Sequence, residues 1–237
     1  MNITVIIQAR MGSSRLPGKV LKEVFPGKSL LSVMIDRLRL SKLATQFIVA
    51  TTSLPADQLI AEECQKLEVL CYQSLHEEVD VLSRFVDTAK HFNAELIVRI
   101  CADSPLHDAE ILDACIQKYL EMSNKLDFVT NFKPETYPYG TAVEVFPFDV
   151  LLRMDRLSKE PDIREHVTQF FHRNPNLFRY CNVTSSEDFS TLKWAVDTVE
   201  DFEMIRTMYS RIGQQNLTEN WRSIASRQFQ EASIKKF

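Results

Sequence analysis

Short apolar runs and longer amphipathic segments alternate along the first half of the chain. The short runs are rich in Val and Ile and predict strands, whereas apolar residues spaced three and four apart predict helices. The predicted strands are residues 3–7, 47–50, 69–72 and 96–100. The predicted helices are residues 29–40, 55–67, 79–92 and 108–120. In the last two helices, Val79 is expected to face inward and Asp108 to be the N-cap. This alternation predicts an α/β fold, a mainly parallel sheet with helices on both faces.

The second half of the chain departs from this alternation, because strand-like segments predominate there. The expected strands are 128–130, 143–146, 178–183 and 192–196, with helices that begin near 148 and 163. A further helix is expected to open at Asp197 and to be closed by Gly213. Residues 214–237 are polar, with a weak helical pattern around Trp221. We therefore expect one domain over residues 1–213 and a C-terminal helical extension over residues 214–237.

A cationic loop follows the first apolar run. Two of the five glycines, Gly12 and Gly18, bracket it, and Arg10, Arg15 and Lys19 lie in or beside it. Glycine lets backbone N–H groups approach an anion, and Arg and Lys neutralise its charge, so the loop is typical of a phosphate-binding site. It is not a P-loop, which has four residues between its glycines, and no Gly-x-Gly-x-x-Gly occurs. The alternative is an arginine-rich surface turn.

The composition argues against several classes of protein. A net charge of −4 disfavours a general nucleic-acid binder, which would carry a basic face. The five cysteines are scattered without a Cys-x-x-Cys pair, which favours free thiols over disulfides or a zinc site. No apolar run reaches the length of a membrane span. We therefore expect a cytoplasmic protein that binds neither nucleic acid nor membranes.

Two isolated acids, Asp103 and Asp197, each follow an apolar run. Ligands of open α/β sheets bind beyond the carboxyl ends of the strands. Beside a phosphate-binding loop, two such carboxylates predict Mg²⁺, which takes one or two carboxylates together with phosphate oxygens and water. Each acid also has a structural explanation, Asp103 as a turn former and Asp197 as a helix N-cap. No Asp-x-Asp occurs, the acid pair common in metal-dependent glycosyltransferases.

A series of motifs covers most of the chain. The motifs are Gln8-Ala9-Arg10-Met11-Gly12-Ser13-Ser14-Arg15-Leu16-Pro17-Gly18-Lys19, Ala50-Thr51-Thr52, Asp80-Val81-Leu82-Ser83-Arg84, Val98-Arg99 with Asp103 and Pro105, Tyr137-Pro138 with Gly140, Val143-Glu144-Val145-Phe146, Arg164-Glu165-His166-Val167-Thr168, and Trp194 with Val196-Asp197-Thr198. In this order they resemble the cytidylyltransferase-like family of spore-coat polysaccharide biosynthesis protein F. That family is related to the acylneuraminate and Kdo cytidylyltransferases. The resemblance spans roughly residues 3–211, and the first motif is the most specific.

The resemblance implies a Rossmann-like nucleotidyltransferase that joins CMP from CTP to a sugar acid or modified sugar for surface polysaccharide biosynthesis, with release of pyrophosphate. CTP and a small sugar would be its partners, and a homodimer is compatible with it. The implied catalytic residues are Arg10, Lys19, Asp103 and Asp197, with Mg²⁺ on Asp103 and Asp197. The implied nucleotide-binding residues are Gln8, Ala9, Arg10, Met11, Gly12, Ser13, Arg15, Lys19, Thr51, Arg84 and Asp103, and the implied substrate-binding residues are Tyr137, Gly140, Glu144, Arg164 and His166.

The chain departs from this family at two places. Gln73-Ser74 replaces a frequent Arg-Gly near the base in relatives, and Ala142 replaces a usual Asp, which removes a sugar or metal contact. His166 could touch the sugar or lie on a helix surface, and Glu144 could face the site or water. Two other functions stay open. They are a glycosyltransferase that uses a sugar nucleotide, which the missing Asp-x-Asp disfavours, and a degenerate nucleotide-sugar-binding protein.

Overall fold

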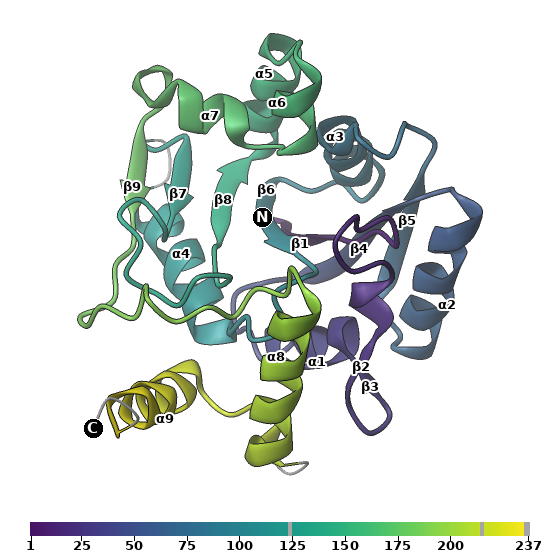
Figure 1. Ribbon diagram of the computed structural model, residues 1–237. Helices are drawn as coiled ribbons and strands as arrows, with labels where there is room; N and C mark the ends of the chain where they lie inside the picture. The colour runs from purple at the N-terminus through teal and green to yellow at the C-terminus, as the bar shows by residue number, and fades with distance from the viewer. Residues whose placement is uncertain (123–124, 214–215, 235–237) are drawn as a thin grey trace.

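The computed structural model describes residues 1–122, 125–213 and 216–234, with side chains described as far as residue 230. Within these residues, one sheet dominates the fold (Figure 1). Its strands lie in the order β5 (Leu70–Ser74), β4 (Gln46–Thr52), β1 (Ile3–Gln8), β6 (Leu96–Cys101), β8 (Glu144–Pro147), β7 (Phe128–Thr130) and β9 (Tyr180–Asn182). The four strands from β5 to β6 run parallel, whereas β8 is antiparallel to both neighbours. The predicted α/β class with a mainly parallel sheet is confirmed.

The central strand β1 explains why helices must cover both faces of the sheet. Val5, Ile6 and Ile7 are all fully buried, with Val5 and Ile7 in the core of one face and Ile6 in the core of the other. Successive side chains of a strand point to opposite faces, so a continuous apolar run is stable only when both are covered. The burial of each such side chain contributes on the order of 1.5–3 kcal/mol.

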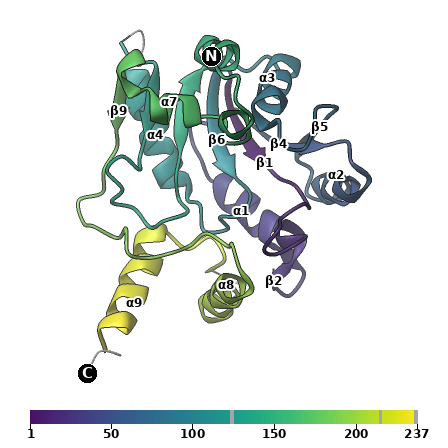
Figure 2. The same ribbon diagram turned by 45° about the horizontal axis from the view of Figure 1, so that its top comes forward.

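The helices supply these two covers. One core contains residues of α1 (Leu30–Leu38), α2 (Gln58–Lys66), α4 (Ala109–Glu121), α8 (Val199–Ile212) and α9 (Trp221–Ile234), and the other contains residues of α3 (Val81–His91), α5 (Phe148–Leu157) and α7 (Gln169–Arg173). The short α6 (Pro161–Glu165) packs against α3. Both views place α8 and α9 at the end of the molecule opposite α3 and α7 (Figures 1 and 2).

Shorter elements complete the described chain. They are the 3₁₀ helices η1 (Lys19–Leu21), η2 (Pro55–Asp57) and η3 (Pro175–Leu177), and the hairpin strands β2 (Glu23–Phe25) and β3 (Lys28–Ser29). No helix in the described part of the chain is both long and apolar enough to cross a membrane.

Two expectations about local structure are wrong. Residues 192–196 form no strand, since within the described part of the chain the segment makes one isolated bridge, from Lys193 to Tyr139, and then donates the Val196 N–H to the Asp103 carbonyl. Its alternating pattern arises because Leu192, Trp194 and Val196 bury one side of an extended crossing segment. The helix expected over 79–92 begins only after its N-cap, Asp80, and Val79 is 45% exposed.

The C-terminal helix predicted around Trp221 is present as α9. Trp221 is fully buried, and its ring lies against those of Tyr137 and Phe189, with centroid separations of 5.1 and 5.7 Å. Ile224 and Ala225 belong to the same core as β1. The helix therefore packs onto the main body, and the expected boundary at residue 213 stays a prediction.

Candidate active site

A cleft of about 480 Å³ opens beyond the carboxyl ends of β1 and β6. This is the edge at which open α/β sheets bind their ligands. The predicted site residues that line it are Gln8, Ala9, Arg10, Ser13, Arg15, Lys19, Arg84, Asp103, Gly140, His166 and Asp197. Ala142, where the family usually has Asp, lines it too, whereas Gln73 and Ser74 do not.

The loop after β1 is closed by its own backbone. The Met11 carbonyl accepts hydrogen bonds from the N–H groups of Ser13 and Gly18, both at 2.9 Å. Gly18 has a φ of 69°, a left-handed conformation that favours glycine. Asp57 anchors the loop from outside, because its carboxylate accepts the Met11 N–H at 2.7 Å. Lys19 then begins η1, so the loop delivers this ammonium group from a fixed backbone.

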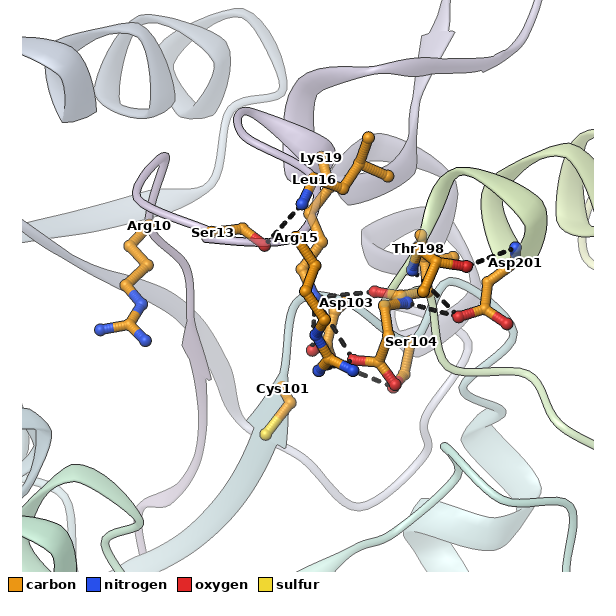
Figure 3. Close-up of polar contacts among 12 residues, drawn as sticks. Arg10, Ser13, Arg15, Leu16, Lys19, Cys101, Asp103, Ser104, Thr198 and Asp201 are labelled. Atoms are coloured by element: carbon orange, nitrogen blue, oxygen red, sulfur yellow. Dashed lines mark hydrogen bonds and ion pairs between the residues drawn. The ribbon is translucent and has the colours of Figure 1, made fainter.

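Lys19 joins the two predicted metal ligands; Figure 3 labels Lys19 and one of them, Asp103. Its Nζ lies 2.9 Å from Oδ2 of Asp103 and 3.9 Å from Oδ1 of Asp197, and it donates to the Val196 carbonyl at 2.7 Å. Arg15 holds the same Asp197 oxygen at 2.8 Å. Arg10 lies apart from this cluster (Figure 3). The structure thus brings Asp103 and Asp197 together at one edge of the cleft, and their chemical roles stay predictions.

Asp197 is not the N-cap of the following helix. Thr198 caps α8 by accepting the Asp201 N–H, and the Asp201 carboxylate accepts the N–H groups of both Thr198 and Asp197. This capping box satisfies the helix start by itself. The Asp197 carboxylate therefore contacts Arg15, Lys19 and Lys193 and has no capping duty.

The two carboxylates fit a hard divalent cation. Among the described residues, no group of three or more His, Cys, Asp or Glu side chains gathers as a metal site. Mg²⁺ needs no such cage, because it keeps waters and takes further oxygens from a bound phosphate. Asp103 and Asp197 both lie beside the Lys19 ammonium group. Their carboxylate oxygens are the donor type that this ion prefers.

A second group of charges lies around Arg10. Its guanidinium contacts Glu165 at 2.9 Å and Glu78 at 3.8 Å. Arg84 is 1% exposed and donates to the Glu78 carbonyl, but its Nε has no partner in the described part of the chain. Burial is the main reason that the pKa of Arg84 is lowered. Gly12 leaves room for the Glu78 carboxylate, which a Cβ at this position would strike.

Three of the predicted substrate-binding residues do not line the cleft. Glu144 is 1% exposed, with its carboxylate bound by Arg99 at 2.5 Å, by His172 at 2.8 Å and by the Thr168 hydroxyl at 2.9 Å. Burial alone would raise the pKa of Glu144, but the charge of Arg99 and the contact with His172 outweigh it and lower the pKa to about 2. The expectation that Glu144 faces either the site or water is therefore wrong, because it lies beneath the cleft.

Arg164 and Tyr137 are also held elsewhere. Arg164 contacts Asp80 at 3.0 Å and Asp155 at 2.9 Å, which ties α6 to α3 and α5. Tyr137 packs on Trp221 and is 5% exposed. Three predicted nucleotide-binding residues lie outside the cleft lining as well, namely Met11, Gly12 and Thr51. Met11 and Gly12 lie between Arg10 and Ser13, which line the cleft, whereas Thr51 is fully buried within β4.

Several cleft residues were missed by sequence reasoning, namely Arg99, Cys101, Phe132, Glu135, Tyr139 and Glu165, together with His107. His107 is 2% exposed, and burial, followed by the charge of Arg37, lowers its pKa to about 3, so it is neutral. Arg99 and Glu165 lie within motifs that resemble the cytidylyltransferase-like family, which is a usable signal. Phe132, Glu135 and Tyr139 come from an irregular segment after β7, where no periodic pattern marks a site.

The comparisons with known proteins show the class of protein to which this fold and cleft belong, a nucleotidyltransferase. The family model for cytidylyltransferases matches residues 4–227, so the chain belongs to the cytidylyltransferase family. It is 31% identical over 220 residues to spore coat polysaccharide biosynthesis protein SpsF of Bacillus subtilis strain 168, covering 90% of this chain and 88% of that protein.

Solved structures agree with this assignment. A cytidylyltransferase from Leptospira borgpetersenii serovar Hardjo-bovis superposes with a TM-score of 0.92 at 29% identity, over 99% of this chain and 96% of that one. A CMP:2-keto-3-deoxy-manno-octonic acid synthetase in complex with CTP shares the fold, with a TM-score of 0.67 at 19% identity over 89% and 99% of the two chains. A Mycobacterium tuberculosis protein in complex with manganese also shares it, with a TM-score of 0.56 at 17% identity over 87% and 99%.

Proposed function

We propose that this enzyme transfers CMP from CTP to a hydroxyl group of a sugar acid or modified sugar and releases pyrophosphate. The observation that carries the proposal is the meeting of three loop cations, Arg10, Arg15 and Lys19, with the carboxylate pair Asp103 and Asp197 in one cleft. The CTP-bound synthetase of the same fold supports CTP as the nucleotide. The name of the Bacillus subtilis relative supports a place in surface polysaccharide biosynthesis.

The cations would hold the triphosphate. Arg15 is 64% exposed and Lys19 11% exposed at its side chain, so Arg15 can swing onto a phosphate while Lys19 acts from a fixed position. Each now contacts a carboxylate. A triphosphate would replace the carboxylates as partner of the cations, and Asp103 and Asp197 would then be free to bind Mg²⁺. The manganese complex of the same fold supports a divalent ion of this kind.

The reaction needs no protein nucleophile. The oxygen of a sugar hydroxyl forms a bond to the α-phosphorus, and its proton is released to water. The bond from that phosphorus to the oxygen that bridges to the β-phosphate breaks, and pyrophosphate leaves with the electron pair. Bound Mg²⁺ would neutralise charge on the phosphate oxygens. The cations of the loop orient the triphosphate and stabilise the charge that develops on the leaving group, which is the main source of catalysis in phosphoryl transfer.

Arg84 is suited to the nucleoside end of the cleft. Its Nε is a buried donor without a partner among the described residues, and it lies on α3 beside the loop that carries Glu78. A buried unpaired donor costs on the order of 1–3 kcal/mol, which a ligand oxygen would recover. Gln73 instead donates to Gln58 on the surface, away from the cleft.

Release of pyrophosphate tests the proposal directly. Purified enzyme is incubated with Mg²⁺, one of the four ribonucleoside triphosphates, and a panel of nonulosonic acids, hexoses, hexosamines and uronic acids. We expect pyrophosphate only when CTP and an accepted sugar are both present, and a CMP-sugar detectable by mass spectrometry. Consumption of a CMP-sugar without CTP would identify a glycosyltransferase instead. Binding of CTP without turnover for any sugar would favour the degenerate binding protein.

A further inference from the structure

One wall of the cleft differs in chemistry from the phosphate-binding loop. It is formed by the segment after β7, which contributes Phe132, Glu135, Tyr139 and Gly140. Phe132 and Glu135 face each other across a tight turn as an isolated β-bridge. The side chain of Asn182 in β9 holds this turn twice, by accepting the Lys133 N–H at 2.8 Å and donating to the Pro134 carbonyl at 3.0 Å. The wall is thus a positioned element rather than a loose loop.

Tyr139 connects this wall to the reaction centre. Its backbone N–H donates to the Leu192 carbonyl at 2.8 Å, and its carbonyl accepts the Trp194 N–H at 2.7 Å. Burial, followed by the charges of Asp197 and Asp103, raises the pKa of the Tyr139 phenol. Tyr139 and Glu135 line the same cleft as the carboxylate pair Asp103 and Asp197. Gly140 follows with a φ of 103°, and a Cβ there would lie 2.6 Å from the Ala195 nitrogen.

Glu135 is the exception among the carboxylates that line the cleft. Asp103, Asp197 and Glu165 are all paired with Lys19, Arg15 or Arg10. Glu135 has no hydrogen-bond or ion-pair partner for its carboxylate anywhere in the described part of the chain. Arg99, another cation in the lining, already contacts Glu144. Among the described residues that line the cleft, this wall therefore presents one unpaired carboxylate. The ammonium group of Lys133, in the same turn, lies 3.5 Å from the His172 carbonyl and is not part of the lining.

We propose that Glu135 sets acceptor specificity by binding the ammonium group of an amino sugar, with Phe132 and Tyr139 flanking the sugar ring. This inference rests on the proposed CMP transfer and narrows its substrate from a sugar acid or modified sugar to an amino sugar. A carboxylate accepts hydrogen bonds from an ammonium group with charge assistance, whereas a sugar carboxylate in the same place would meet a like charge. Aromatic side chains pack against the apolar face of a sugar ring. The amine only binds, and the attacking group remains a sugar hydroxyl.

The test measures binding and turnover separately. Saturation-transfer NMR in the presence of CTP and Ca²⁺, used to slow turnover, reports which sugars bind among glucosamine, galactosamine and mannosamine, their parent hexoses and the matching uronic acids. Pyrophosphate release with Mg²⁺ gives kcat and KM for each sugar that turns over. The variants are Glu135→Gln, Glu135→Lys and the control Glu62→Gln, which removes an exposed acid of α2 outside the cleft. Calorimetry with CTP alone checks the nucleotide site of each.

We expect a hexosamine to bind at least tenfold tighter than the matching uronic acid. Glu135→Gln should reduce that ratio about tenfold through KM, Glu135→Lys should invert it, and Glu62→Gln should leave it unchanged. Failure of every hexosamine to bind, preference for a uronic acid, or an unchanged ratio in Glu135→Gln would each overturn the inference while CTP still binds. Loss of CTP binding in the wild-type enzyme would instead count against the proposed function.

Discussion

The two ends of the cleft follow different structural rules. At the nucleotide end, a glycine-closed loop and two strand-end acids come from regular elements, and their charges are paired with one another. At the acceptor end, a turn held by Asn182 presents aromatic rings and the unpaired Glu135. The phosphates of a nucleotide can be met by a preformed set of cations and acids. An acceptor varies between enzymes, so its contacts come from an irregular segment that can change without disturbing the sheet.

The largest effect is expected beneath the acceptor end, where Glu144→Gln breaks a buried ion pair. It leaves Arg99 without its carboxylate partner, and we expect the free energy of unfolding to fall by about 3 kcal/mol. This value is at the lower end of the range for a broken buried ion pair, because Arg99 also lines the cleft. Urea unfolding at pH 7 measures it. The exposed Glu62→Gln serves as control, and a loss below about 1 kcal/mol would show that Glu144 is not a structural anchor.

The same pair predicts a pH dependence. The pKa of Glu144 is lowered to about 2 from its ordinary 4.5, so its contribution to stability is complete above pH 4.5 and is lost as the pH falls through 2. The difference in unfolding free energy between wild type and Glu144→Gln should therefore shrink as the pH falls through this window. Unfolding curves at pH 7, 4.5 and 3 would show this, and a constant difference would contradict it.

At the nucleotide end, Asp197→Asn should separate chemistry from folding. Thr198 and Asp201 cap α8 without Asp197, so the melting temperature should hardly change. Pyrophosphate release with CTP and an accepted sugar should fall on the order of a hundredfold, as for the loss of one charge stabiliser of a transition state. Thr198→Ala should have the opposite effects: the free energy of unfolding should fall by about 1 kcal/mol because the cap is lost, while the rate of pyrophosphate release should stay close to that of the wild type. Wild-type turnover in Asp197→Asn would return this residue to a structural role.

Lys19→Ala and Arg15→Ala should each weaken binding of CTP more than binding of CMP, because we expect both cations to contact the β- and γ-phosphates. The loss for CTP should be on the order of 1.5–3 kcal/mol for a charged hydrogen bond. Lys19 should lie at the upper end and Arg15 at the lower end, since Arg15 is 64% exposed and Lys19 only 11%. Calorimetry with both nucleotides tests this, and equal losses for CTP and CMP would mean that the residues only shape the loop.

The smallest effect is expected from Gln73→Ala. Gln73 contacts Gln58 on the surface and does not line the cleft, so KM for CTP should change by less than about twofold. Kinetics with CTP and UTP measure both affinity and selectivity. A marked gain in UTP use would show that this loop reaches the base after all.

Much of the fold and the nucleotide end could be predicted from sequence because periodicity and loop chemistry report local structure. The strands around β1, the cap at Asp108 and the juxtaposition of Asp103 with Asp197 follow from such patterns. The prediction for Glu144 is wrong because the alternation of apolar and polar residues along a strand only shows which residues share a face. It does not show whether a charged side chain lies buried beneath a cleft or in water. Residues 192–196 were misread because burial of one side imitates a strand even without sheet neighbours. Glu135 lies in a segment whose position depends on Asn182, about fifty residues later, and no local pattern encodes that contact.

The pairing of charges across the cleft has a kinetic consequence. Five cations line it, Arg10, Arg15, Lys19, Arg84 and Arg99, and four carboxylates line it with them, Asp103, Glu135, Glu165 and Asp197. Glu78 and Glu144 lie directly behind, so little net field extends into the solvent. Electrostatic steering accelerates association only when such a field extends into the solvent before salt screens it. We therefore expect the rate at which CTP associates to depend only weakly on ionic strength. On the proposed function, recognition of the triphosphate would begin at contact, when each phosphate would displace a carboxylate from its cation.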